Sequence, residues 1–183
     1  MLEKHPIDTD ILEDIYNIIK PGVSKIINRA NKRTNPEWDN YTSKEFLDQL
    51  DDQEVPKSSH NNLVRIRRYI DIPEIMWQVQ TAFPKKKIIL SGDFYYPPTG
   101  FMGWHTNHDA PCDRLYINYA SEDKKSFFRY YWDGKIVTDY DNKGMNARMF
   151  TCPGERPYFW HCVGSECDRI SFGYTLNRDK NYG

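Results

Sequence analysis

The sequence predicts an α+β chain, mainly β, in which N-terminal helices pack against a double-sheet jelly roll. The apolar pattern changes from helical to alternating near residue 84. About eight short strands then follow within about 95 residues, and aromatic residues, 15% of the chain, suit pleated surfaces. We therefore expect one domain over residues 1–183, with a helical flanking region at 1–84, a jelly-roll core at 85–177 and a tail at 178–183.

The flanking region contains three segments with apolar residues at helical spacing. Each begins with Asp or Thr followed three residues later by Glu, which is a capping pattern for a helix start. Proline disrupts a helix interior because it has no N–H to donate. Helices are therefore expected at 10–30, with a break or kink at Pro21-Gly22, at 42–50 and at 71–83, with loops at 31–41 and 51–62.

The core region alternates apolar and polar residues between turn signals. Asp133-Gly134 is a two-residue hairpin signal between aromatic segments. Strands are expected at 87–96, 101–107, 114–120, 126–131, 135–140, 145–152, 157–163 and 169–176.

Charge gives no strong signal for nucleic acid or an anionic membrane. Lys and Arg number 25 and Asp and Glu 26, for a net charge of −1, so no global field attracts polyanions. The basic clusters at 65–68 and 85–87 are interpreted as solvated faces rather than phosphate sites. No run approaches the ~18 apolar residues of a membrane helix, and the N-terminus lacks an apolar signal segment. A cytoplasmic location is the expectation.

Four cysteines are present and none forms a C-x-x-C pair. Without an export signal, free thiols are expected rather than disulfides. The alternative is a zinc site built from Cys152, Cys162, Cys167 and His161, although this spacing fits no standard zinc pattern.

The most informative pattern is an ordered set of polar residues on the predicted strands. His105 and Asn107 are two residues apart and would share one strand face. His161 falls on a late strand, which a jelly roll brings beside an early one, and Arg169 and Ser171 again share a face. A lone strand histidine is usually a hydrogen-bonded structural residue, so the order of the whole set, rather than any one residue, points to a metal site.

With these residues in place, the segment from about 86 to 177 resembles the double-stranded β-helix of the iron(II)- and 2-oxoglutarate-dependent dioxygenases. It is similar to their prolyl-hydroxylase and nucleic-acid-demethylase branches in having tyrosines and a glycine-containing turn before the histidine motif. The resemblance implies metal binding by His105 and His161, binding of the cosubstrate 2-oxoglutarate by Arg169 with Ser171 as its small polar neighbour, and a cosubstrate contact from Tyr95 or Tyr96. An arginine fork suits the distal carboxylate of 2-oxoglutarate.

The function implied is an oxygenase that uses iron(II), dioxygen and 2-oxoglutarate to oxidise, by hydroxylation, a substrate that the sequence does not identify. Two alternatives come from other classes. One is a non-catalytic jelly-roll module that binds a metal or ligand, and the other is a cupin-type metal protein with no use for 2-oxoglutarate.

Asn107 departs from the family pattern, which has Asp or Glu two residues after the first histidine. Three interpretations remain open. Asn107 coordinates iron through its neutral amide oxygen; or water or a halide fills the third position, as in the related halogenases; or Asp109 supplies the carboxylate, which needs a sharp turn at His108. His108 itself is expected to face away from the site.

Four further residues are assigned structural roles. Arg129 and Arg148 could recognise a carboxylate or phosphate, but edge or rim positions with packed stems are favoured. Trp104 and Trp160 flank the two histidines in sequence and are expected in the core, on the opposite face.

Overall fold

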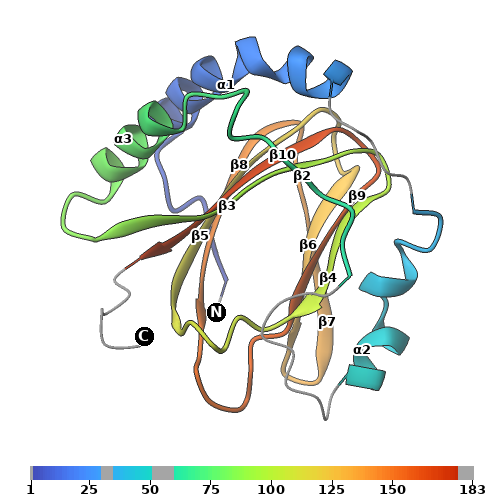
Figure 1. The fold of residues 1–183 in the computed structure, drawn as a ribbon. Helices are drawn as coiled ribbons and strands as arrows, with labels where there is room; N and C mark the ends of the chain where they lie inside the picture. The colour runs from blue at the N-terminus through green and yellow to red at the C-terminus, as the bar shows by residue number, and fades with distance from the viewer. Residues whose placement is uncertain (1, 30–34, 51–59, 177–183) are drawn as a thin grey trace.

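Ten strands form two antiparallel sheets in the computed structural model, which describes residues 2–29, 35–50 and 60–176 (Figure 1). The larger sheet contains, in spatial order, β1 (Glu3–Lys4), β8 (Gly144–Cys152), β5 (Cys112–Ala120), β10 (Arg169–Leu176), β3 (Ile88–Tyr96) and β2 (Val64–Arg65). The smaller sheet contains β4 (Gly100–His105), β9 (His161–Ser165), β6 (Ser126–Trp132) and β7 (Lys135–Tyr140). The predicted double-sheet jelly roll is confirmed.

Strand β10 shows how alternation divides the core chemistry between two faces. Ile170, Phe172 and Tyr174 are buried in the cluster that includes the helices. Ser171 and Gly173 instead line a cavity between the sheets. Successive strand residues point to opposite faces. The apolar residues of β10 therefore pack against the helices, while Ser171 and Gly173 face the space between the sheets.

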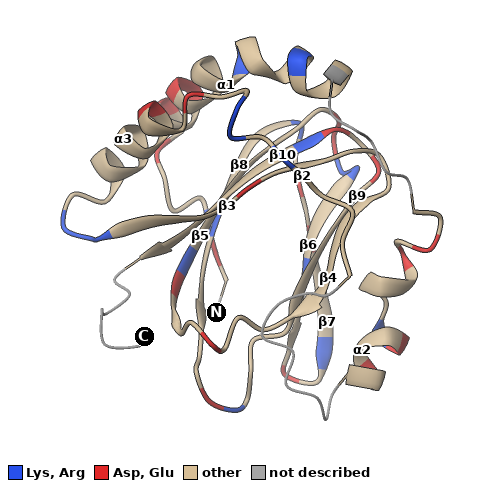
Figure 2. Cartoon of the chain, in the orientation of Figure 1, with Lys and Arg blue, Asp and Glu red and all other residues tan. Residues whose placement is uncertain are grey.

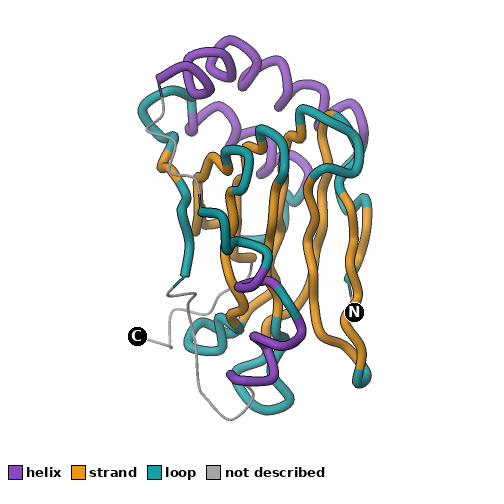
Figure 3. The backbone as a smooth tube through the Cα atoms, turned by 90° about the vertical axis from the view of Figure 1, so that its right-hand side faces the viewer, coloured by secondary structure: helices purple, strands orange, loops and turns teal. Residues whose placement is uncertain are grey.

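Helices α1 (Thr9–Arg29) and α3 (Ile72–Ala82) lie together on the outer side of the larger sheet (Figures 1 and 3). Ile15, Ile19 and Ile26 of α1 are fully buried there. The helix continues through Pro21, so a break at this position, one of the two expected outcomes, is wrong. Buried isoleucines on both sides of the proline stabilise the helix by more than the missing hydrogen bond costs.

Helix α2 (Lys44–Leu50) packs on the outer side of the smaller sheet. Its Leu47 belongs to a buried cluster with Trp104 and Trp160, and the two tryptophans are 1% and 5% exposed. They are core residues, as expected. The capping residue is Ser43, whose Oγ accepts from the Phe46 N–H at 3.1 Å, rather than the predicted Thr42.

Thr42 ends a short 3-10 helix, η1 (Asn40–Thr42), and this is why it does not cap α2. Strands β1 and β2 have two residues each and lie at the edges of the larger sheet. Neither was predicted, because two residues are too few to display a period. Most of the predicted 51–62 loop and the whole 178–183 tail lie outside the described residues.

Two of the predicted strand ends that differ in the structure affect the interior. The strand predicted at 101–107 ends at His105, and the one predicted at 157–163 begins at His161. The hairpin signal is confirmed: Asp133 has φ 49° and Gly134 has φ 75°, the positive values that a two-residue turn of this type requires.

Acidic and basic side chains are interspersed along the chain (Figure 2). Arg65 and Arg67, from the first predicted basic cluster, have side chains that are 60% and 66% exposed and pair with Asp93. Lys86, from the second, lies 3.6 Å from an Asp113 carboxylate oxygen. These residues are partnered surface cations, as expected. None of the helices within the described ranges is long and apolar enough to cross a membrane.

The helix-covered face of the larger sheet can be tested with a matched pair of isoleucines. Ile117 of β5 is fully buried and Ile89 of β3 is 42% exposed. We expect Ile117→Ala to lower the free energy of unfolding by about 2–5 kcal/mol because it leaves a cavity, and Ile89→Ala to change it by at most about 1 kcal/mol. Urea denaturation of both variants checks this, and equal losses would contradict the assigned layers.

Candidate functional site

The pairing of β4 with β9 places His105 directly opposite His161. The two ring centroids are 4.1 Å apart, and the residues are 2% and 0% exposed. A register irregularity between Met102 and His105 interrupts the strand pairing just before the first histidine. The two histidines, 56 positions apart in the sequence, are therefore brought together in the interior.

Backbone carbonyls orient both rings. Nδ1 of His105 lies 2.8 Å from the Gly103 carbonyl oxygen, and Nδ1 of His161 lies 2.9 Å from that of Phe159. Each Nδ1–H donates to its carbonyl, which makes Nε2 the unprotonated nitrogen that could ligate a metal.

Both imidazoles are held neutral. Burial lowers the pKa of His105 to about 4. Burial and, to a lesser degree, the neighbouring His105 lower the pKa of His161 well below its ordinary value. A metal-ligating histidine must be unprotonated, so the protonation state suits a metal ion.

Asn107 reaches the histidines by a route the sequence did not suggest. It lies beyond the end of β4 with φ 55°, in the left-handed region, so the prediction that it shares a strand face with His105 is wrong. Its Nδ2 lies 3.2 Å from Nε2 of His161, and the amide donates to that lone pair. A left-handed residue after the strand, which Asn tolerates better than most, turns the side chain back toward the pair.

The candidate metal ligands are two neutral imidazoles and one amide. Among the described residues, no group of three or more His, Cys, Asp and Glu side chains is placed to hold a metal. Asp109 therefore does not complete a triad with the histidines in this structure. The zinc alternative is also wrong, and Cys112, Cys152, Cys162 and Cys167 are free thiols, as expected.

His108 lies away from this group, as expected. Its ring stacks on Tyr158 with centroids 4.5 Å apart, and its Nδ1 lies 2.8 Å from the Thr106 hydroxyl.

A cavity of about 540 Å³ opens beside the histidines. His105 and Asn107 line one part of it, and Tyr96 and Ser171 of the larger sheet line another. The Phe128, Phe150 and Phe159 rings surround His161, with centroids 5.1–5.5 Å from the imidazole. The phenyl rings keep water from His161, whereas His105 lines the cavity directly.

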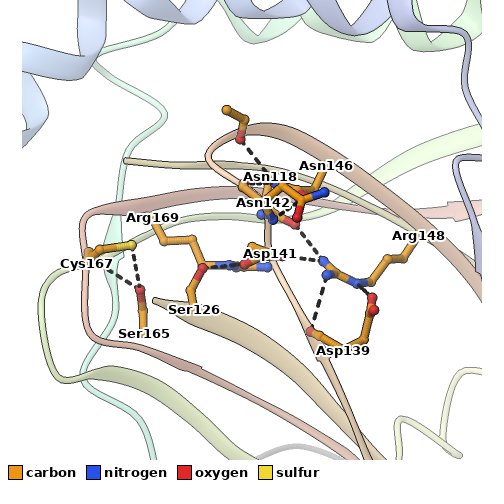
Figure 4. A network of polar contacts seen from close by, with 11 residues as sticks. Asn118, Ser126, Asp139, Asp141, Asn142, Asn146, Arg148, Ser165, Cys167 and Arg169 are labelled. Carbon is orange, nitrogen blue, oxygen red and sulfur yellow. Dashed lines mark hydrogen bonds and ion pairs between the residues drawn. The ribbon is translucent and has the colours of Figure 1, made fainter. Parts of the chain in front are cut away.

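Arg169 is completely buried at the start of β10, within a network of ion pairs (Figure 4). Its Nε donates to an Asp141 carboxylate oxygen at 2.8 Å, and the other Asp141 oxygen accepts from Nη1 of Arg148 at 2.6 Å. Burial alone would raise the pKa of Asp141, but the two guanidiniums hold it well below its ordinary value.

Three buried donors in this part of the interior lack an acceptor within the described residues: Nη1 and Nη2 of Arg169 and Nδ2 of Asn118. Asn118 lies directly opposite Ser171 in the β5–β10 pairing. Buried donors are rarely left unpaired, so a cluster containing donors alone fits an anion, and the two Nη atoms present a fork that matches a carboxylate.

Tyr95 and Tyr96, the two tyrosines expected to contact the cosubstrate, lie on opposite faces of β3. Tyr96 lies under the Arg169 guanidinium, 4.9 Å from ring centroid to Cζ, and burial raises its pKa to about 12. Tyr95 faces the helix layer instead, and its hydroxyl bonds to Asp168 at 2.5 Å. Strand alternation excludes Tyr95 from the cosubstrate position, so that half of the prediction is wrong.

The expected rim position of Arg148 is also wrong. It is 3% exposed and bonds to both Asp139 and Asp141. The aspartates lie at the end of the preceding hairpin, beyond the reach of a strand-period argument. Arg129 is half-buried, donates to Thr138 and to the Thr42 carbonyl, and fits its expected structural role.

Sequence reasoning missed Arg114, which is 6% exposed and lines the cavity from β5. A signal was available. Leu115 and Ile117 are the apolar, helix-facing residues of that strand, so alternation directs Arg114 and Tyr116 inward.

No protein family description and no curated protein sequence matches this chain. Solved structures do. A prolyl hydroxylase from Trichoplax adhaerens, determined with a hypoxia inducible factor oxygen degradation domain peptide, matches 98% of this chain and 84% of its own, with a TM-score of 0.52 and 11% identity. A Pseudomonas putida prolyl-4-hydroxylase matches 97% and 92%, with a TM-score of 0.48 and 12% identity. The chain therefore has a fold like that of the first of these hydroxylases.

The Asp141 network yields a prediction for stability. Asp141→Asn would leave Arg148 and Arg169 without their shared carboxylate, so we expect a loss of about 3–5 kcal/mol in the free energy of unfolding at neutral pH. Asp133→Asn, at an exposed hairpin turn, removes the same charge and should change it by no more than about 0.5 kcal/mol.

The pH dependence follows from the direction of the shift. Because folding lowers the pKa of Asp141, its stabilisation is present above the pKa of an unfolded aspartate, about 3.9, and is lost as the pH falls below it. The gap between parent and Asp141→Asn in denaturant titrations should therefore narrow in acid. A gap that stayed constant down to pH 3 would show that the Asp141 charge does not stabilise the fold.

Proposed function

We propose that this protein is an iron(II)- and 2-oxoglutarate-dependent oxygenase that hydroxylates its substrate. The observation that carries the proposal is the combination of two neutral, carbonyl-oriented histidines with a buried arginine whose two Nη atoms have no acceptor among the described residues. When bound, iron(II) and 2-oxoglutarate supply the activation of dioxygen.

The residues divide the work between two regions of the interior. His105 and His161 would hold the ion through Nε2, with Asn107 as the adjacent amide. Arg169 would bind the distal carboxylate of the cosubstrate, and Ser171 and Tyr96 line the cavity beside it. The fixed positions of these side chains on β10 and β3 would orient the cosubstrate relative to the histidines.

Asn107 weakens the proposed centre relative to a carboxylate triad. An aspartate would place a negative charge about 2 Å from a divalent ion, and a low-dielectric interior magnifies that attraction. The amide donates to His161 here, so it must rotate to present its oxygen. The interpretations with water or a halide in this position remain open.

A second candidate function rests on the same hydrogen bond. Asn107 and His161 satisfy each other, which is what a non-catalytic jelly-roll module that has lost its carboxylate would show. Iron binding and cosubstrate turnover separate this candidate from the oxygenase.

Metal affinity tests the role of Asn107. We expect Asn107→Asp to tighten iron(II) binding by about tenfold or more because it restores a charged ligand, and His105→Ala to abolish binding. His108→Ala, next to the site but stacked on Tyr158, is the matched control and should bind as the parent does.

These affinities are measured by anaerobic titration, with succinate release followed with and without chloride. A hydroxylase keeps or gains activity on Asn107→Asp, whereas a halogenase-type enzyme loses its halide position and shifts toward hydroxylation. Iron affinity that is the same in Asn107→Asp and parent would remove Asn107 from the ligand set. Parent protein without iron affinity or succinate release would support the non-catalytic module.

Cosubstrate affinity tests Arg169. Arg169→Lys keeps a cation beside Asp141 but loses the planar fork, so we expect 2-oxoglutarate to bind about 10- to 100-fold more weakly. Arg129→Lys, which changes a guanidinium outside the cavity, should leave the dissociation constant unchanged. Calorimetric titration of manganese(II)-loaded protein measures both, and thermal unfolding confirms that each variant folds. Equal affinity in Arg169→Lys and parent would assign Arg169 a purely structural role.

A further inference from the structure

Arg114 is a buried cation with spare hydrogen-bonding capacity inside the cavity. It is 6% exposed. Its Nη2 donates to the Ala110 carbonyl at 3.2 Å, whereas its Nε is buried and has no acceptor within the described part of the chain. Its side chain lines the same cavity as His105 and Asn107.

The charge of Arg114 is not matched as the other interior charges are. Arg148 and Arg169 pair with Asp141. Across residues 2–29, 35–50 and 60–176, Arg114 forms no ion pair with a carboxylate, although Asp109 lines the same cavity. An uncompensated buried charge is costly, and an anionic ligand would remove that cost.

The cavity has room for a ligand next to Arg114. Thr175 lies opposite Arg114 in the β5–β10 pairing, and Gly173 lies opposite Tyr116. A Cβ at Gly173 would come within 3.3 Å of a Tyr116 ring carbon and of the Ser91 hydroxyl oxygen. The glycine thus keeps the surface beside Arg114 free of a side chain.

Arg114 is distinct from the arginine assigned to the cosubstrate. Arg169 pairs with Ala120 and Arg114 with Thr175 along the same two strands. Six residues separate these positions on β10, about 20 Å between their backbones. The two arginines therefore lie at opposite ends of these strands, Arg169 within the ion-pair network and Arg114 near the histidines.

We propose that the substrate of this site carries a carboxylate and that Arg114 pairs with it, holding the substrate beside His105. This inference rests on the proposed oxygenase function and names its substrate class. A planar carboxylate matches the guanidinium geometry and the single uncompensated charge. A phosphate dianion would exceed that charge and would add repulsion from Asp109.

The test follows the Arg114 Nε–H resonance by ¹⁵N NMR in protein loaded with zinc(II), as a diamagnetic substitute, and 2-oxoglutarate. The probes are N-acetylalanine, its C-terminal amide, and the α-amide of N-acetylglutamate. Saturable shifts with a carboxylate probe and none with N-acetylalaninamide are expected. A response to N-acetylalanine indicates a free acid or chain terminus, and a response to the glutamate derivative indicates an acidic side chain in a peptide.

Arg114→Gln removes the charge of the arginine, and Arg129→Gln is its matched control. We expect Arg114→Gln to weaken binding of the responding acid about 10- to 100-fold, while 2-oxoglutarate affinity changes less than about twofold. Arg129→Gln, outside the cavity, should bind the acid as the parent does. Thermal unfolding of each variant confirms that it folds.

Three results would overturn the assignment. They are no shift with either acid, an equal shift with chloride at matched ionic strength, or a shift caused by 2-oxoglutarate alone together with at least tenfold weaker cosubstrate binding in Arg114→Gln. Failure of the oxygenase function itself is seen separately, because the iron and 2-oxoglutarate titrations need no acid probe. Repeating the acid titration on metal-free protein separates the two cases.

Discussion

The arrangement of the interior depends on the ion pairs that Asp141 forms with Arg148 and Arg169. The two arginines belong to the larger sheet, whereas Asp141 follows β7 of the smaller one and accepts from Ser126 of β6 at 2.5 Å. The ion pairs therefore join the two sheets. Because Nε of Arg169 donates to Asp141, the two Nη atoms, which have no acceptor among the described residues, are left for a ligand. The contact that stabilises the fold therefore also shapes the proposed cosubstrate site.

Strand periodicity predicted most of this architecture because it is a local property. The core strands and the inward placement of His105, His161, Arg169 and Ser171 follow from alternation along each strand. The same rule, applied with the phase set by Leu115 and Ile117, would also have found Arg114. To apply the rule to β5, one needs only to identify the apolar face of the strand, and the neighbouring strands need not be known.

Apart from Arg114, the features that sequence reasoning missed depend on contacts outside a single strand. Asn107 reaches His161 from a left-handed residue after β4, and no period describes such a turn. Arg148 is buried because two aspartates from a preceding hairpin meet it, a coincidence of topology. Edge strands β1 and β2 exist only because longer strands offer them unpaired backbone groups.

Two of the departures from expectation, Asn107 and Arg114, are electrostatically linked. A carboxylate at position 107 would lie in the same cavity as Arg114 and would offset its charge. The amide contributes none, and Asp109, the carboxylate that does line the cavity, is exposed. If iron(II) and the 2-oxoglutarate dianion were bound and balanced each other, the positive charge of Arg114 would be left over in a buried space. A low-dielectric interior makes that surplus costly. A neutral side chain at position 107, together with an arginine that has no carboxylate partner among the described residues, would thus favour an anion in the cavity, whether the substrate carboxylate proposed here or a halide at the proposed metal. The same pair would discriminate against a cationic substrate.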